Sequence, residues 1–388
     1  MRMVRALLLG PAGSASLRKK FGQINWSLIF LVSLVSCIGF ATLYSAAGGN
    51  LEPWAERQMT RFAIGMAMLV AIALIDIRFW FKFAYVLYGL AFVALVAIEV
   101  AADLRIFRMG AQRWLDLGVF QLQPSELMKV ALVLVLARYF HGLSYEDVGR
   151  PTRLIWPTLL VLAPAALVAK QPDLGSAILL VMTGAVIFLA AGVRIWKFLL
   201  IGMAGGAVIP VAWRFLREYQ RNRVLTFLNP ENDPLGAGYH IIQSRIALGS
   251  GGVWGKGYLQ GTQAHLQFLP ERQTDFIFPM FAEEFGLVGA VLLIGLYVLI
   301  LIYGLAIALR AQTQFGRLTA IGLVVIFFVY AFINMAMVQG LVPVVGIPLP
   351  FMSYGGTAMM SLLIAFGILI GVYVHRDVRV GRRGVEDD

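Results

Sequence analysis

Charged side chains are scarce in this sequence. Only 14% of its 388 residues are Asp, Glu, Lys or Arg, while 60% are hydrophobic; ordinary soluble domains have roughly 25% charged and 45–50% apolar residues. A water-soluble chain of this composition would have too little polar surface. The composition therefore excludes a cytosolic enzyme, a disordered chain and a secreted disulfide-bonded domain.

Cysteine and histidine are also rare. Cys37 is the only cysteine, so neither an intramolecular disulfide nor a metal–thiolate cluster can form within the chain. The four histidines are scattered, and no HExxH, GxSxG or phosphate-loop motif occurs. We therefore expect chemistry that does not use ATP.

Long apolar runs take the place of these motifs. A membrane-spanning helix needs about 20 predominantly apolar residues. We assign ten apolar runs as spans, at about residues 24–47, 62–75, 79–100, 125–143, 153–169, 174–192, 196–216, 276–309, 317–341 and 356–374, of which 62–75 is the shortest. The sequence predicts an all-α, polytopic membrane protein with ten transmembrane helices. We expect one domain over residues 1–388, with tails at 1–22 and 375–388 and a large extracytoplasmic loop, 217–275, between spans 7 and 8.

Basic residues indicate the orientation of the chain. An even number of spans places both termini on one side. The tails and loops of that side hold 18 Lys and Arg residues, whereas the short loops of the other side hold six. Because cytoplasmic loops collect basic residues, we expect both termini in the cytoplasm of a cell with an inner (cytoplasmic) membrane. The net charge of +11 then reflects topology, and no nucleic acid partner is expected.

Lys129 needs a partner inside the bilayer. It lies in the first turns of the fourth span, where the helix dipole disfavours a cation, and intramembrane charges pair or line a cavity. Glu126, three residues earlier, is one candidate. Asp173 at the start of span 6 is another, although it could simply cap that helix. We expect a structural ion pair between Lys129 and Asp173.

Span 8 carries two adjacent carboxylates, Glu283 and Glu284. At 1.5 Å per residue they lie about 12–13 Å from the start of the run. Both cannot face lipid, so we expect at least one to be protonated, paired or placed in a polar cavity.

The loop before span 8 holds two further features. Residues 238–249, which include Arg245, predict an amphipathic helix at the membrane surface. The Gly-rich stretch 249–257 follows. It is either a flexible turn or a cradle in which backbone amides and Lys256 face a pyrophosphate.

Asp275 is the last charge before span 8. It could be a helix N-cap, together with Thr274. Alternatively, a partly desolvated carboxylate at a membrane interface can act as a base, and Glu271 and Arg272 lie close by in sequence. In the loop before span 4, Arg113 and Trp114 are either an interface anchor or a pair that faces a sugar or pyrophosphate.

The loop 343–356 contains three prolines and no charge. Its backbone must be satisfied by protein or a cavity, so we expect a packed or re-entrant segment there.

Together these motifs resemble the SEDS family (shape, elongation, division and sporulation proteins). The most specific stretches are GYHIIQSRIALGSGGVWGKG (238–257), FLPERQTDFIF (268–278), GIPLPFMSYGG (346–356), QRW (112–114), PSELMK (124–129) and KQPDLGS (170–176). The GTQ at 261–263 and QTDF at 273–276 look like the elongation branch of the family, because the division branch usually reads HTDF.

The resemblance implies a ten-span peptidoglycan glycosyltransferase that polymerises lipid II into glycan strands during cell elongation. The family's essential aspartate falls on Asp275, its structural pair on Lys129 and Asp173, and its sensitive tryptophan on Trp114. It also implies contact with membrane lipid, the elongation machinery and a class B penicillin-binding protein, a transpeptidase that meets the region of spans 8 and 9.

The expected chemistry suits the residues present. The donor sugar carries its own pyrophosphate leaving group, so one base and one source of positive charge suffice for an inverting displacement. Asp275 is the candidate base. Arg113, Arg245, Lys256 or a divalent cation such as Mg²⁺ or Mn²⁺ could stabilise the pyrophosphate, and Trp114 and Glu271 could contact substrate. No obligatory cofactor or metal site follows from the sequence. Two alternatives are a lipid II flippase and a non-catalytic scaffold for the penicillin-binding protein.

Overall fold

The computed structural model describes residues 17–100, 105–108, 111–116, 121–144, 146–200, 237–266, 268, 269, 271–378, 380 and 381, with isolated residues between 202 and 229. Eight helices in this part of the chain are long and apolar enough to cross a membrane. They are α3 (Trp26–Ala46), α4 (Ala55–Leu74), α5 (Ile77–Val100), α7 (Pro151–Lys170), α8 (Leu174–Ala191), α13 (Ile277–Arg310), α14 (Gln314–Val338) and α15 (Gly356–Val374). The predicted all-α, polytopic membrane fold is confirmed.

The two other predicted spans, 4 and 7, are not among these eight helices. Helix α6 (Pro124–His141) forms where span 4 was predicted, but its 18 residues include three charged side chains, Glu126, Lys129 and Arg138, so it is not among the eight. The predicted span 7, residues 196–216, lies largely outside the described residues. The count of ten therefore stays a prediction.

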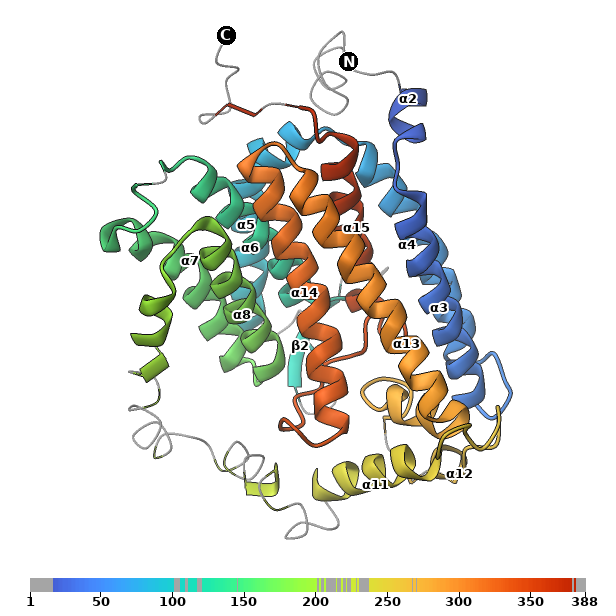
Figure 1. The fold of residues 1–388 in the computed structure, drawn as a ribbon. Coiled ribbons are helices and arrows are strands. Elements are labelled where there is room, and N and C mark those ends of the chain that lie inside the picture. Colours follow the sequence, from blue (N-terminus) through green and yellow to red (C-terminus); the bar gives the residue numbers. More distant parts are fainter. Residues whose placement is uncertain are drawn as a thin grey trace.

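Helices α14 and α15 form the centre of the bundle. In each, 72% of the most apolar 18-residue window is buried, compared with 22% in α4 and α5. Helix α15 packs on α4, α13 on α14, α5 on α6 and α7 on α8. Figure 1 shows α2 (Leu17–Gly22) at one end of the bundle, and α11 (Ala237–Ser250) and α12 (Thr262–His265) at the opposite end.

A small antiparallel sheet, which was not predicted, precedes α6. Strands β1 (Arg105–Arg108), β2 (Ala111–Asp116) and β3 (Gln121–Leu122) follow one another in space. Trp114 lies opposite Ile106, beside an irregularity in the β1–β2 register. The sheet contacts α5 and α6 through β2, so Trp114 is carried by a short sheet.

Helix α13 is broken at Gly286. This residue has φ 67° and ψ −166°, a region that is open essentially only to glycine. Residues 277–285 and 287–310 are therefore two separate helical segments. The second is about 36 Å long at 1.5 Å per residue and can span a hydrocarbon core of about 30 Å alone. The expectation that Glu283 and Glu284 lie deep within a continuous span is wrong, because the break puts both on the other segment.

The proline-rich loop after α14 is packed inside the protein, as predicted. Ile347, Leu349, Phe351 and Met352 are buried. Helices on several sides satisfy its backbone: the Tyr297 hydroxyl donates to the Pro350 carbonyl at 2.6 Å. This loop forms the floor on which the Asp275 segment lies.

Candidate functional site

Asp275 lies between α13 and the proline-rich loop. Its side chain is partly exposed. One carboxylate oxygen, Oδ2, lies 3.4 Å from where a Cβ atom on Gly346 would be. Helix α13 begins after Phe276, which serves as its N-cap without a side-chain hydrogen bond. The N-cap position of α13 is thus Phe276 and not Asp275, for which a helix cap was the alternative to a catalytic role.

The backbone of Asp275 is fixed by Asn334. The buried side-chain amide of Asn334 donates to the Asp275 carbonyl at 3.0 Å and to the Ile347 carbonyl at 2.7 Å. Asn334 lies in the last turns of α14, which ends at Val338. The Asn334 side chain thus joins the backbone of Asp275 to the floor loop, near the C-terminal end of α14.

Two further hydrogen bonds tie the Asp275 segment to the floor loop. The Ser353 hydroxyl donates to the Thr274 carbonyl at 2.5 Å, and the Tyr354 amide donates to the Gln273 carbonyl at 2.8 Å. Three consecutive residues before α13 are therefore positioned by residues more than 50 positions away in sequence. The sequence offered no signal for these partners.

Glu271 orders the same segment from within. It has φ 51°, in the left-handed region, and its Oε2 accepts hydrogen bonds from Gln273 and Thr274, each at 3.2 Å. The predicted role of Glu271 in substrate binding stays a prediction. Beside it, the Arg272 guanidinium lies 5.9 Å from the centre of the Trp54 ring, and burial lowers the pKa of Arg272.

Arg245 closes the end of α14. Its guanidinium donates to the carbonyls of Gln339 at 3.1 Å and Gly340 at 3.3 Å, and the Ser244 hydroxyl donates to Val338 at 2.6 Å. These carbonyls have no partner within the helix, and a cation suits the negative helix end. The helix predicted over residues 238–249 is confirmed as α11, and Arg245 docks it on α14. Its place at the membrane surface stays a prediction.

Lys256 points into the protein. Its Nζ lies 2.7 Å from Glu283 Oε1 and 2.7 Å from the Thr262 hydroxyl. Glu283 Oε1 also accepts from the Gln263 amide at 3.1 Å. Lys256 therefore neutralises a buried carboxylate while its own side chain stays partly exposed, and its predicted contact with a pyrophosphate stays a prediction. The expectation that at least one of the two adjacent carboxylates is paired is confirmed at Glu283.

The Gly-rich stretch around Lys256 is held in place by α13 rather than forming a flexible turn. The amides of Lys256 and Gly257 donate to the carbonyls of Glu283 and Glu284 at 3.0 and 3.1 Å. A Cβ atom on Gly255, which has φ 83°, would overlap the Glu284 carbonyl. Glycine is required here because the loop backbone lies directly on the broken helix.

Glu284 completes this polar cluster. The Ser45 hydroxyl donates to its Oε1, and His265 Nε2 lies 3.5 Å from the same oxygen. Burial raises the pKa of Tyr258, and the nearby Glu284 adds to the rise. Glu283 and Glu284 therefore both have protein partners.

Lys129 has a different partner from the one predicted. Its Nζ lies 2.7 Å from Glu126 Oε1 and contacts the Tyr330 hydroxyl. Glu126 also accepts from Tyr330 at 2.7 Å and from Ser361 at 2.9 Å. Among the described residues, the expected ion pair between Lys129 and Asp173 is absent. Helical spacing brings Glu126 next to Lys129 on the same face.

Asp173 instead caps α8. Its Oδ1 accepts from the Ser176 amide at 3.2 Å, and its Oδ2 accepts from Gln123 at 3.2 Å. The alternative considered for this residue, a helix cap, is therefore the one the structure contains. Asp173 lies beside the start of α6 through Gln123, which precedes Pro124.

Arg113 and Trp114 are both on β2. Trp114 is partly exposed, as either role considered for it requires. The side chain of Arg113 lies outside the part of the chain that the structure describes, so its role stays a prediction.

Sequence reasoning missed Arg61. This residue is on α4, and its guanidinium lies 5.3 Å from the centre of the Tyr354 ring and next to Gly356 at the start of α15. Tyr354 is bonded through its amide to Gln273, two residues before Asp275. The only signal in the sequence was an arginine directly before the apolar run 62–75, and the count of basic residues used it for the orientation of the chain alone.

The arrangement can serve acid–base chemistry on an anionic substrate. The partly exposed Asp275 carboxylate belongs to a segment that is held from several sides, and the Arg61 guanidinium of α4 lies over the Tyr354 ring of the neighbouring loop. Among the described residues, no group of three or more His, Cys, Asp and Glu side chains could hold a metal ion. A divalent cation therefore stays an untested expectation.

Known proteins share this sequence and fold. The profile of the cell cycle protein family that comprises FtsW, RodA and SpoVE matches residues 23–378. The peptidoglycan glycosyltransferase MrdB of Escherichia coli K12 is 47% identical over 362 residues, which cover 91% of this chain and 95% of that protein. The stage V sporulation protein E of Bacillus subtilis is 34% identical over 358 residues, covering 89% and 95%.

Solved structures agree. The crystal structure of the rod shape determining protein RodA of Thermus thermophilus is 29% identical, with a TM-score of 0.68, and the match covers 92% of this chain and 98% of that one. A chain from a study of how a peptidoglycan synthase complex coordinates polymerization and crosslinking is 32% identical, with a TM-score of 0.78, covering 91% and 98%. The higher identity to MrdB agrees with the elongation-type motifs of the sequence, and the chain belongs to the FtsW/RodA/SpoVE family of cell cycle proteins.

Proposed function

We propose that this protein is a peptidoglycan glycosyltransferase that polymerises lipid II into glycan strands for cell elongation. One observation carries the proposal: 47% identity, across 95% of its length, to a protein named peptidoglycan glycosyltransferase MrdB. The signature residues around the candidate site lie within the matched family region, 23–378.

The proposed reaction is a single displacement. The acceptor's 4-hydroxyl loses its proton to Asp275 and attacks the anomeric carbon of the donor sugar. The bond from that carbon to the pyrophosphate oxygen breaks, polyprenyl pyrophosphate leaves, and the configuration inverts. One base suffices, because the leaving group is already activated.

Asp275 is the carboxylate best suited to be this base. Glu283 is neutralised by Lys256 at 2.7 Å, Glu284 is buried against Ser45, and Glu126 is enclosed by Lys129, Tyr330 and Ser361. Asp275 keeps a partly exposed side chain, which a substrate hydroxyl can reach.

Positive charge for the departing pyrophosphate has fewer sources than the sequence suggested. Lys256 is engaged with Glu283 and Arg245 with the end of α14. Arg61 becomes a candidate, because Tyr354 joins it to the Asp275 segment. Arg113 and a divalent cation remain from the earlier set. Such preorganised charge is typically the largest contribution to catalysis of this kind.

We further propose that both termini are cytoplasmic and that the site is extracytoplasmic. The distribution of Lys and Arg supports this orientation. The partner that we propose is a class B penicillin-binding protein that docks at spans 8 and 9. Likeness to a chain of a complex that coordinates polymerization and crosslinking supports a partner of this class.

One assay separates the polymerase from the two alternatives. The purified chain, alone and with its partner, is incubated with fluorescent lipid II, and the products are resolved by gel electrophoresis. The proposal predicts glycan chains. Transfer of lipid II across the membrane of vesicles, without polymer, would indicate a flippase. The absence of both polymer and transfer would indicate a scaffold.

A further inference from the structure

The loop between Gly251 and Gln260 displays apolar side chains at the end of the bundle that holds the candidate site. Its backbone is packed on α13, but four of its apolar side chains are exposed. The exposed fractions are 54% for Val253, 80% for Trp254, 39% for Tyr258 and 40% for Leu259. A tryptophan with four fifths of its surface uncovered needs an explanation beyond packing.

The fold holds this display in place. The amides of Leu287 and Val288 donate to the carbonyls of Gly252 at 2.9 Å and Val253 at 3.1 Å. These two bonds flank Trp254 on its N-terminal side and attach the loop to the first turn after the break in α13. Lys256, on the other side, is bonded to Glu283 through both its amide and its ammonium group. The backbone on both sides of Trp254 is therefore fixed against α13.

The position along the membrane normal follows from α13. The segment 287–310 is about 36 Å long, slightly more than the hydrocarbon core of about 30 Å, and Arg310 ends it on the opposite side. The break at Gly286, and with it Trp254, thus lies at the edge of the hydrocarbon. The exposed apolar face of α13 begins directly there, at Leu287 and Val288, which are 59% and 37% exposed.

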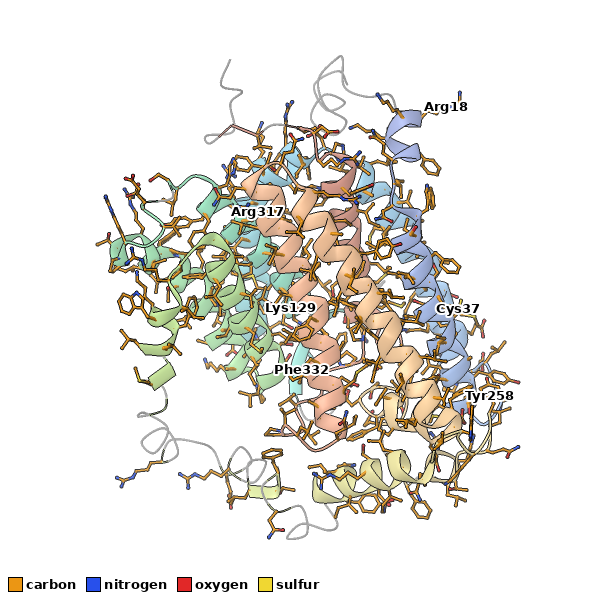
Figure 2. All side chains as sticks on the ribbon, viewed as in Figure 1. Arg18, Cys37, Lys129, Tyr258, Arg317 and Phe332 are labelled. Atoms are coloured by element: carbon orange, nitrogen blue, oxygen red, sulfur yellow. The ribbon has the colours of Figure 1, made fainter. Side chains whose placement is uncertain are left out.

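Helix α3 independently places the loop at the same position along the membrane normal. The Tyr258 hydroxyl donates to the Ala41 carbonyl at 2.8 Å, and the apolar helix α3 ends five residues later at Ala46. Figure 2 shows Tyr258 beside this end of the bundle, with Arg18 at the opposite end. Both helices that carry the loop therefore place it at one membrane boundary.

The chemistry of the loop favours lipid over a charged partner. Its single charged residue, Lys256, forms an ion pair with Glu283. Trp and Tyr side chains prefer the headgroup level, where an apolar ring meets the bilayer and a polar tip finds a hydrogen bond. The exposed surface of the loop is neutral, aromatic and continuous with the lipid-facing side of α13.

We propose that residues 251–260 are a membrane-interface anchor whose side chains at Val253 and Trp254 insert into the boundary between phospholipid headgroups and acyl chains. The anchor holds the break in α13 at this boundary. It thereby sets the depth of the segment 277–285 and of Asp275, which precedes it. This inference does not depend on the proposed enzymatic activity.

Electron paramagnetic resonance of the full-length protein tests the anchor. The exposed Cys37 is replaced by alanine, and a nitroxide label is attached to Trp254→Cys in nanodiscs of dioleoylphosphatidylcholine. Accessibility to oxygen, which partitions into lipid, is compared with accessibility to a water-soluble nickel chelate. Labels at Leu292→Cys, on the exposed face of α13, and at Arg18→Cys, exposed on α2, serve as lipid and aqueous references.

The anchor predicts that oxygen reaches the label at Trp254→Cys severalfold more than it reaches the label at Arg18→Cys. The Trp254→Cys label should lie about 5–10 Å into the boundary between headgroups and acyl chains. Val253→Cys, one position away, should give a similar result and protects the test against a folding defect at 254. Nickel accessibility equal to that of the aqueous reference would overturn the proposal. Protection from both reagents would overturn it as well, because the loop would then be covered by protein.

Discussion

Lys129 Nζ lies 2.7 Å from Glu126 Oε1, with both side chains buried among α6, α14 and α15. Tyr330 and Ser361 donate to the same carboxylate, so one glutamate joins three helices. A buried charge that loses its only counter-charge is strongly destabilising. This relationship explains how a polar helix can lie inside an apolar bundle.

The first prediction concerns the partner of Lys129. We expect Lys129→Met or Glu126→Gln alone to lower the free energy of unfolding by about 3–5 kcal/mol, because each leaves a buried charge or donor without its partner. A double-mutant cycle on thermal unfolding in detergent should give strong coupling between Lys129 and Glu126 and weaker coupling between Lys129 and Asp173. Stronger coupling to Asp173 would restore the pair expected from the sequence.

The second prediction concerns the break in α13. Gly286→Ala forces a Cβ atom against the backbone of Val253 and Gly255 and places alanine at a positive φ. We expect a loss of about 1–3 kcal/mol in stability. Gly295→Ala is the matched control, since a Cβ atom there meets nothing within 4 Å, and alanine favours a helix. Equal unfolding temperatures for the two variants would contradict the break.

The third prediction concerns the partner surface. Small residues permit close approach of a partner helix, and span 8 contains four of them, Gly286, Gly289, Ala290 and Gly295. Gly286 lies against the loop, Gly289 against Phe285, and Ala290 is buried. Only Gly295 of the four faces open space. Gly295→Leu should therefore weaken binding of the class B penicillin-binding protein severalfold in co-purification.

Crosslinking completes that test. A photoreactive residue in the transmembrane helix of the partner should crosslink to α13 and α14. Crosslinks confined to α3 or α6, which correspond to spans 1 and 4, would refute docking at spans 8 and 9. Gly89→Leu provides the control for the Gly295 variant, because Gly89 also has no neighbour within 4 Å but lies on α5.

The fourth prediction concerns positive charge near Asp275. Arg61→Met should reduce the rate of polymerisation by about 10²–10³-fold, as loss of one preorganised electrostatic group does, and should leave the unfolding temperature nearly unchanged. Arg57→Met is the control, one turn earlier on α4 and exposed. If both variants polymerise lipid II at the rate of the unmodified protein, Arg61 has no part in stabilising the pyrophosphate.

Hydropathy predicted the spans well because burying apolar residues in lipid needs no specific partner. Eight apolar helices, α6 and the packed proline-rich loop all formed where the sequence placed them. Periodicity also located α11. These features depend on local composition, which the sequence contains in full.

Partners distant in sequence were not predictable in the same way. Lys129 had two acidic candidates, and the choice of Glu126 depends on Tyr330, about 200 residues away. Gly286 looks like Gly295 in the sequence, and only the contact with the loop at Gly255 distinguishes them. Nothing near Lys256 in the sequence showed that Glu283 would lie beside it. Tertiary packing decides each of these.

The most direct test of the account is polymerisation of lipid II by Asp275→Asn. Asparagine caps a helix about as well as aspartate and is similar in size, but it cannot accept the acceptor's proton. We predict that this variant folds and binds its partner normally and is slowed by about 10²–10⁴-fold, whereas Glu56→Gln, which removes an exposed carboxylate on α4, remains active. Polymerisation by Asp275→Asn at close to the normal rate would contradict the assignment of Asp275 as the catalytic base.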